Sequence, residues 1–134
     1  EEIEKLAGNK SIKNIVEAEP IGPNSMIDVM LILPCTGNTL AKLTYGITDN
    51  AVLMATKSHL RNNKPVVIAL STNDALGMNA KNIGTLINTK NFYFVPFSQD
   101  AAETKPNSLA FNKEKVVETL EKALDEKQIQ PIID

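Results

Sequence analysis

Short apolar runs alternate with amphipathic stretches along most of the chain. The runs lie at residues 28–33 (DVMLIL), 65–70 (PVVIAL) and 92–97 (FYFVPF), and none of them alternates regularly with polar residues. This pattern is typical of strands that are buried on both faces of a parallel sheet. The sequence therefore predicts three short buried strands.

The segments between and after these runs have helical spacing. Their apolar residues fall into four groups: Leu40, Leu43 and Ile47; Val52, Leu53, Ala55 and Leu60; Ile83, Leu86 and Ile87; and Val116, Val117, Leu120 and Leu124, which are expected to form one apolar face. Strands and helices in alternation predict right-handed crossovers and a parallel sheet with helices on both sides. The expected fold class is α/β, a three-layer parallel sheet.

The first part of the chain has a different pattern. Residues 1–10 are expected to form the last turns of a helix that ends at Gly8, and residues 11–16 a short helix capped by Ser11. Residues 17–26, which are rich in Pro and Gly, are expected to connect this region to the first strand.

Three strands are few for a doubly wound sheet, which usually has about five or six. An edge formed by residues 28–33 would also be very apolar for a strand in contact with water. Two explanations remain open: the first strands of the domain are absent from this chain, or a neighbouring subunit covers the edge. We treat residues 1–134 as one domain that is incomplete on its N-terminal side.

Composition and charge restrict the function classes. The chain has 134 residues, of which 43% are hydrophobic and 22% charged, as expected for one globular domain. A net charge of -2 and an aromatic content of 4% give no reason to expect nucleic acid or an anionic membrane as a partner. A single cysteine suits a reducing compartment, and no apolar segment reaches the roughly 18 to 20 residues that span a bilayer. We therefore expect a cytoplasmic protein.

Polar loops follow all three predicted strands. They are residues 34–39 (PCTGNT), 71–79 (STNDALGMN) and 98–108 (SQDAAETKPNS), and the first two also contain glycine. Ligands of parallel sheets bind outside the carboxyl ends of the strands. A binding site is therefore expected where these loops meet.

The loop at residues 34–39 has two possible roles, and the spacing leaves both open. In the simpler one, Thr36 or Asn38 caps a helix and Gly37 allows the chain to turn. In the other, free backbone N–H groups at the helix start act with Thr36, Asn38 and Thr39 to bind the polar edge of a cofactor. Neither a P-loop nor a dinucleotide-binding glycine motif occurs in the chain.

Several single residues have a plain structural interpretation. Cys35 is expected to be a small buried side chain, and Lys42 a solvated lysine. His59, the only histidine, is expected to face solvent near a helix C-terminus. Thr48 or Asp49 is expected to cap the next helix. No group of residues has the spacing of metal ligands and no nucleophile and base can be paired, so neither a metal site nor a catalytic residue is assigned.

Longer stretches of the sequence resemble a known superfamily. The segments PCTGNTLAKLTYGITDN, VLMATK, KPVVIAL and STND are similar to the flavoprotein superfamily that includes cysteine decarboxylases and flavin prenyltransferases. Within it, the segments SIKNIVEAEPIGP, RNNKPVVIALSTNDALGMNAKNIGTLINTKNFYFVPFSQD and KPNSLA resemble the family of dipicolinate synthase B subunits. The resemblance covers nearly the whole chain.

The resemblance implies a Rossmann-like fold, of which this chain is the C-terminal part, and a flavin cofactor, FMN. It places residues 34–39 against the flavin ring and residues 69–73 close to it. The implied cofactor-binding residues are Thr36, Gly37, Asn38, Thr39, Ser71 and Thr72. The superfamily holds the flavin phosphate with a Gly/Ser-rich loop after its first strand, and this chain contains no match to that loop.

The resemblance also implies an activity and partners. Together with an A subunit, the protein would oxidise a small molecule, dihydrodipicolinate, to dipicolinate in the mother cell of a sporulating bacterium. A homo-oligomer is expected as well. Two alternatives are a non-catalytic partner subunit that keeps a flavoprotein fold, and a flavin-dependent decarboxylase with another substrate.

Two departures from the superfamily argue against its other activities. Phe111 follows Ala110 where decarboxylases of phosphopantothenoylcysteine have a cysteine, which disfavours cysteine decarboxylation. Uncharged Ser71 and Thr72 stand where the prenyltransferases have an arginine, which disfavours a phosphorylated prenyl donor.

Overall fold

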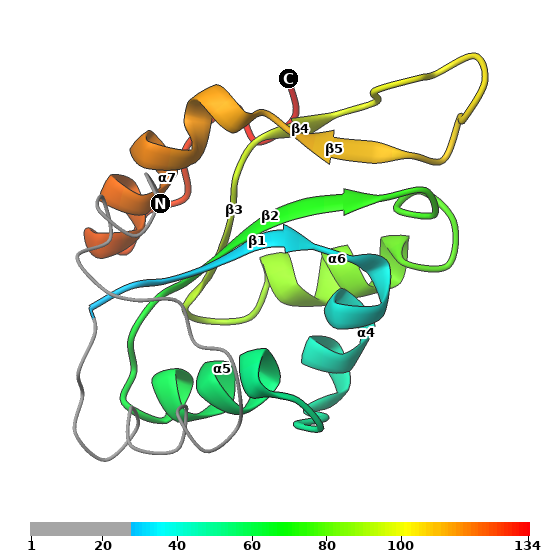
Figure 1. The fold of residues 1–134 in the computed structure, drawn as a ribbon. Coiled ribbons are helices and arrows are strands. Elements are labelled where there is room, and N and C mark those ends of the chain that lie inside the picture. Colours follow the sequence, from blue (N-terminus) through cyan, green and yellow to red (C-terminus); the bar gives the residue numbers. More distant parts are fainter. Residues whose placement is uncertain (1–27) are drawn as a thin grey trace.

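The structure, a computed structural model, describes residues 28–134. The helices expected at residues 1–10 and 11–16 and the connection at residues 17–26 lie outside this range. The elements in chain order are β1 (Met30–Cys35), α4 (Gly37–Tyr45), α5 (Ala51–Arg61), β2 (Val66–Thr72), α6 (Ala80–Ile87), β3 (Phe92–Phe94), β4 (Phe97–Ser98), β5 (Leu109–Phe111), the 3-10 helix η1 (Lys113–Lys115) and α7 (Val116–Leu124) (Figure 1).

Strand β2 is the centre of the sheet. It pairs in parallel with β1, with Met30 opposite Val66, and in parallel with β3, with Phe92 also opposite Val66. Its last two residues pair antiparallel with β5, which in turn pairs antiparallel with β4. The parallel pairing of the first two predicted strands is confirmed.

The expectation of three strands, all parallel, is wrong. The predicted run at residues 92–97 is divided between β3 and β4, and its Pro96 has no N–H with which to continue a ladder. Strand β5 supplies the antiparallel pairs, and its three residues are too few to show a period in the sequence. The result is a mixed sheet of five strands in a Rossmann-like α/β arrangement.

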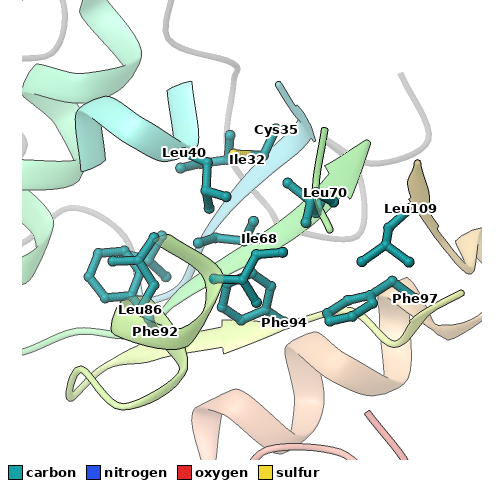
Figure 2. Close-up of a cluster of buried hydrophobic side chains, with 13 residues drawn as sticks. Ile32, Cys35, Leu40, Ile68, Leu70, Leu86, Phe92, Phe94, Phe97 and Leu109 are labelled. Carbon is teal, nitrogen blue, oxygen red and sulfur yellow. The ribbon is translucent and has the colours of Figure 1, made fainter. Parts of the chain in front are cut away.

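The two faces of the sheet carry separate parts of the core. All residues from Val66 to Leu70 are fully buried, as predicted for a strand covered on both sides. Alternate side chains of β2 point to opposite faces, so Ile68 joins the cluster under α4 and α6, while Val67 joins the cluster under α7. Figure 2 shows Ile68 and Leu70 of the first cluster beside Leu40 of α4 and Phe94 of β3.

The helix ends follow ordinary capping chemistry, with one correction. Thr36 caps α4, because its side chain accepts a hydrogen bond from the backbone N–H of Thr39 at 3.2 Å. Helix α5 is capped by Asn50, which accepts from Leu53 N at 2.9 Å, and not by Thr48 or Asp49 as expected. A side-chain oxygen one residue before the helix reaches this N–H, whereas Asp49 pairs with Lys42 at 2.8 Å.

The predicted apolar face of the last helix is only half correct. Val116 and Leu120 are buried, but Val117 and Leu124 are 42% and 52% exposed. Thr119 and Ala123 occupy the buried positions instead, because the i, i+3, i+4, i+7 spacing from Val116 selects them. Ile47 and Ile87, at the ends of their predicted groups, are also exposed. Among the helices of residues 28–134, none has the length and apolar character needed to cross a membrane.

Candidate functional site

A pocket lies at the carboxyl ends of β1 and β2, where the sequence predicts a site. Its volume is about 440 Å³, within the roughly 300 to 1,000 Å³ of small-molecule sites. Seven residues from the start of α4, the end of β2 and the loop before α6 line it: Gly37, Asn38, Ala41, Thr72, Asn73, Asp74 and Asn79. Asp74 is the only charged residue among them.

Gly37 is needed because side chains of the chain itself approach its backbone. A Cβ atom at this position would lie 2.6 Å from Thr72 Oγ1, 2.7 Å from Asn79 Nδ2 and 3.0 Å from Asp74 Oδ1. Gly37 is already the first residue of α4, and Gly46 is the one glycine with a positive φ among the described residues. Close packing, and not an unusual turn, therefore explains this glycine.

The groups that approach Gly37 belong to one hydrogen-bonded cluster, the Asp74 cluster, made of Thr72, Asp74, Asn79 and Asn82. Asp74 Oδ1 accepts from Thr72 Oγ1 at 2.7 Å and from Asn79 Nδ2 at 2.9 Å. Asn82 Nδ2 donates to Asn79 Oδ1 at 2.8 Å. The hydrogen bonds from Asn79 and then Thr72 lower the pKa of Asp74 below its ordinary value, so the carboxylate is ionised at neutral pH.

The structure brings together three of the six residues predicted to bind a cofactor. Gly37, Asn38 and Thr72 line the pocket. Thr36 and Thr39 do not line it, and the Thr36 hydroxyl bonds the backbone N–H and the hydroxyl of Thr39. Ser71 is also absent from the lining, because neighbouring residues of a strand point to opposite faces and Thr72 points toward Gly37.

Two residues that shape the pocket, Asp74 and Asn79, are not among those predicted from the sequence. A local signal could have found this loop, because Asp followed three residues later by Gly is typical of a type I turn. The backbone O of Asp74 accepts from Gly77 N at 2.9 Å and from Asn79 N at 3.2 Å, which folds the loop back on itself. The sequence contains no comparable signal for the approach of this loop to α4.

Two nucleophilic or titratable side chains do not reach the pocket. Cys35 is fully buried, as predicted, and burial raises its pKa to about 12, which makes the thiol inert. His59 is only 1% exposed, so the expectation that it faces solvent is wrong. Its Nε2 lies 2.9 Å from Pro65 O, and this buried partner draws the ring inward. Burial lowers its pKa.

The pocket therefore offers amides, a hydroxyl and one carboxylate, with Ala41 as an apolar contact. Such a lining suits an uncharged ring with a polar edge. Within residues 28–134, no group of three or more His, Cys, Asp or Glu side chains could hold a metal ion.

Comparisons with known proteins agree on one family. The family model described as Flavoprotein matches residues 2–124. The dipicolinate synthase B subunit of Bacillus subtilis (strain 168) is 50% identical over 131 residues, which are 98% of this chain and 66% of that protein. A crystal structure of the dipicolinate synthase B subunit from Bacillus halodurans is 47% identical, with a TM-score of 0.92 over 98% of this chain and 68% of that one.

A more distant match has a different activity. The FMN-dependent cysteine decarboxylase SpaF is 25% identical and has a TM-score of 0.59, over 91% of this chain and 70% of that one. The chain spans about two thirds of the length of the two B subunits.

Proposed function

Because the chain belongs to the flavoprotein family, we propose that it acts as the B subunit of a dipicolinate synthase and that the pocket beside Gly37 holds the ring of a flavin, FMN. The observation that carries this proposal is the pocket itself. It lies where ligands of Rossmann-like sheets bind, and it is lined by the two loops that the resemblance to flavoproteins places at the ring.

The lining fits a flavin ring. The ring is flat and largely apolar, and it has one edge of alternating carbonyl and N–H groups. Ala41 can contact its face, while the amides of Asn38 and Asn73 can donate to its carbonyl oxygens. Gly37 leaves room for Thr72, Asp74 and Asn79 to pack against the start of α4, which fixes this wall of the pocket.

In this function the residues of the chain bind and orient. When bound, the oxidised flavin supplies an acceptor for the hydride that dihydrodipicolinate must lose, with a proton released to solvent, to become dipicolinate. Asn38 and Asn73 would hold the ring edge. Cys35 and His59 are excluded as catalytic groups because both are buried and neither lines the pocket.

Exposed apolar side chains, two of them in a loop that lines the pocket, support a contact with other subunits. Leu76 and Met78 in the loop before α6 are 48% and 73% exposed. Tyr45, at the end of α4, is 66% exposed. We assign these surfaces to contacts with the A subunit of a sporulating cell and with further copies of this chain. A stable monomer in light scattering at micromolar concentration would contradict the contact between copies of this chain.

The proposed cofactor is tested by the visible absorption of the full-length protein, purified without added cofactor. A flavin band supports the proposal. A colourless protein that is folded and does not bind added FMN overturns it, and favours the alternative of a non-catalytic partner subunit with a flavoprotein fold.

A pair of variants at the start of α4 sharpens this test. Asn38→Ala removes one hydrogen bond to the ring, so the flavin affinity should fall by about 0.5 to 1.5 kcal/mol at unchanged melting temperature. Thr36→Ala removes the helix cap, so the free energy of unfolding should fall by about 1 kcal/mol with little change in affinity. Equal affinities in the wild type and in Asn38→Ala would contradict the assigned contact.

A further inference from the structure

Asp74 is held in one orientation by the residues around it. Both side-chain hydrogen bonds that it receives, from Thr72 and Asn79, fall on Oδ1. The side chain is exposed at the pocket, and its second oxygen, Oδ2, receives neither of these bonds. A carboxylate oxygen is only an acceptor, so Oδ2 suits a ligand that brings a hydrogen-bond donor.

The side chain of Asn79 is committed to Asp74 and Asn82, and not to the start of its own helix. Asn79 occupies the N-cap position of α6, where an Asn side chain ordinarily accepts a hydrogen bond from a backbone N–H of the first turn. Here it makes no such bond: its backbone is helical (φ -80°, ψ -6°), its Nδ2 donates to Asp74 and its Oδ1 accepts from Asn82. The start of α6 therefore lacks a side-chain cap.

Asn82 shows a second consequence of the same arrangement. Because Asp74 only accepts, Asn79 must turn Nδ2 toward it and Oδ1 toward Asn82, which must then donate through its own Nδ2. Asn82 Oδ1 is left as a buried acceptor that finds no donor in the part of the chain that the structure describes, and Asn82 is only 4% exposed. An unpaired buried acceptor lowers the free energy of unfolding, so the arrangement that holds Asp74 in place is destabilising at Asn82.

The surroundings of Asp74 decide which donor it selects. The other six lining residues carry no charge, so the carboxylate has no cation of the pocket as a partner. An anionic group would be repelled, whereas an uncharged N–H would gain a charge-assisted hydrogen bond. The edge of a flavin ring has one such group, the imide N–H between its two carbonyls.

We propose that Asp74 is a specificity-determining residue whose Oδ2 accepts a hydrogen bond from the imide N–H of the flavin ring. This inference rests on the proposed flavin site. Asn38 and Asn73 supply donors for the flanking carbonyls, so the pocket complements the whole edge. The pocket therefore binds rings that lack the imide proton with lower affinity.

The test compares FMN with FMN methylated at the imide nitrogen, which has no proton to donate. Dissociation constants are measured by fluorescence titration of the full-length wild type and of Asp74→Asn. The wild type should bind FMN about 10- to 100-fold more tightly than the methylated form, because the lost bond is to a charged acceptor. In Asp74→Asn the remaining carbonyl can keep the bonds from Thr72 and Asn79, while an NH2 group replaces Oδ2, so the preference should largely disappear.

Two further variants complete the design. Asp74→Ala removes both oxygens and should also lose the preference, and its melting temperature reports whether it is folded. Glu121→Gln removes one negative charge, as Asp74→Asn does, but at an exposed position of α7, a helix that packs on the opposite face of the sheet. This control should keep the preference for FMN over the methylated form. Asp74→Asn keeps the shape of the side chain, so the added methyl group meets the same bulk as in the wild type and a change in the ratio of the two constants reports the acceptor.

The outcomes separate this inference from the proposed function. Tight binding of FMN with no preference in the wild type overturns the role of Asp74 and leaves the flavin site standing. A preference that persists in folded Asp74→Asn and Asp74→Ala also overturns it. Failure of the folded wild type to bind either flavin overturns both proposals.

Discussion

Two polar clusters lie at opposite ends of β2, and they use similar residues for different purposes. The Asp74 cluster lies at the carboxyl end of the strand. At the amino end, the His59 cluster consists of His59, Asn63, Pro65 and Asn91, in which His59 Nε2 lies 2.9 Å from Pro65 O and Asn91 Nδ2 donates to Asn63 Oδ1 at 2.8 Å. Both clusters contain deeply buried members, with His59 at 1% and Asn82 at 4% exposure.

The difference lies in where the hydrogen bonds end. Those of the His59 cluster join one segment of the chain to another: Pro65 O also accepts from Met30 N of β1, and Asn91 O accepts from Val66 N. Those of the Asp74 cluster end on a carboxylate that faces a pocket, and they leave one buried acceptor without a donor. The two clusters are similarly buried, and they differ in whether their hydrogen bonds end within the fold or at a pocket.

The largest expected effect comes from adding a single carbon beside the Asp74 cluster. Gly37→Ala places a Cβ atom within 3.0 Å of three polar atoms, so we expect the free energy of unfolding to fall by about 1 to 3 kcal/mol. The matched control is Gly84→Ala in α6, where a Cβ atom would meet nothing within 4 Å. That change should raise stability by about 0.5 to 1 kcal/mol, since glycine is unfavourable inside a helix. Urea denaturation of both variants checks the opposite signs, and equal signs would contradict the packing argument.

A smaller effect is expected at the other end of β2. His59→Leu keeps much of the side-chain volume and removes the hydrogen bond to Pro65 O, which retains its bond from Met30 N. We expect the free energy of unfolding to fall by about 0.5 to 1.5 kcal/mol while the flavin affinity of the folded protein stays unchanged. A loss of flavin affinity at unchanged stability would reverse the roles assigned to the two clusters.

The smallest effect is a pH dependence of stability in the weakly acidic range. Burial lowers the pKa of His59 below 6.5, so the folded state binds a proton less readily than the unfolded state. Stability should therefore be highest above about pH 6.5 and fall as the pH decreases through the lowered pKa. Asp74 also has a lowered pKa, but its ordinary value of 3.8 places its contribution in a more acidic range. The test is to measure the denaturation midpoints of the wild type and of His59→Leu at pH values from 7.5 down to about 5. A wild type that becomes more stable as the pH decreases would contradict the prediction.

Much of the fold could be predicted because strong periodicity extends over long segments. The run of five apolar residues in β2, all buried, predicts a strand of a parallel sheet. The apolar spacing around Leu40 and Leu86 predicts the helices α4 and α6. Strands β4 and β5 have two and three residues, and nothing within them shows that they pair. Their pairing depends on contacts between distant segments, which a local pattern does not record.

The candidate site could be predicted only in part, for a similar reason. The position of the polar loops after the strands indicates the correct end of the sheet, and Gly37 and Asn38 line the pocket there. The sequence does not show that Asp74 and Asn79 fold back against Gly37, because that contact crosses from one loop to another. The burial of His59 does not follow from the sequence, because its partner, Pro65 O, is a backbone group that no side-chain pattern reports.

The central position of β2 affects how the chain folds while the ribosome synthesises it. One edge of β2 is filled by β1, which has already been synthesised when β2 emerges, whereas the other edge is shared by β3 and β5, which follow it by about 20 to 40 residues. At a synthesis rate of roughly 5 to 20 residues per second, this second edge stays unpaired for seconds. During that time the apolar segment Val66–Leu70, which is fully buried in the folded protein, is open to pairing with other nascent chains, and chaperones that bind extended apolar segments would protect it.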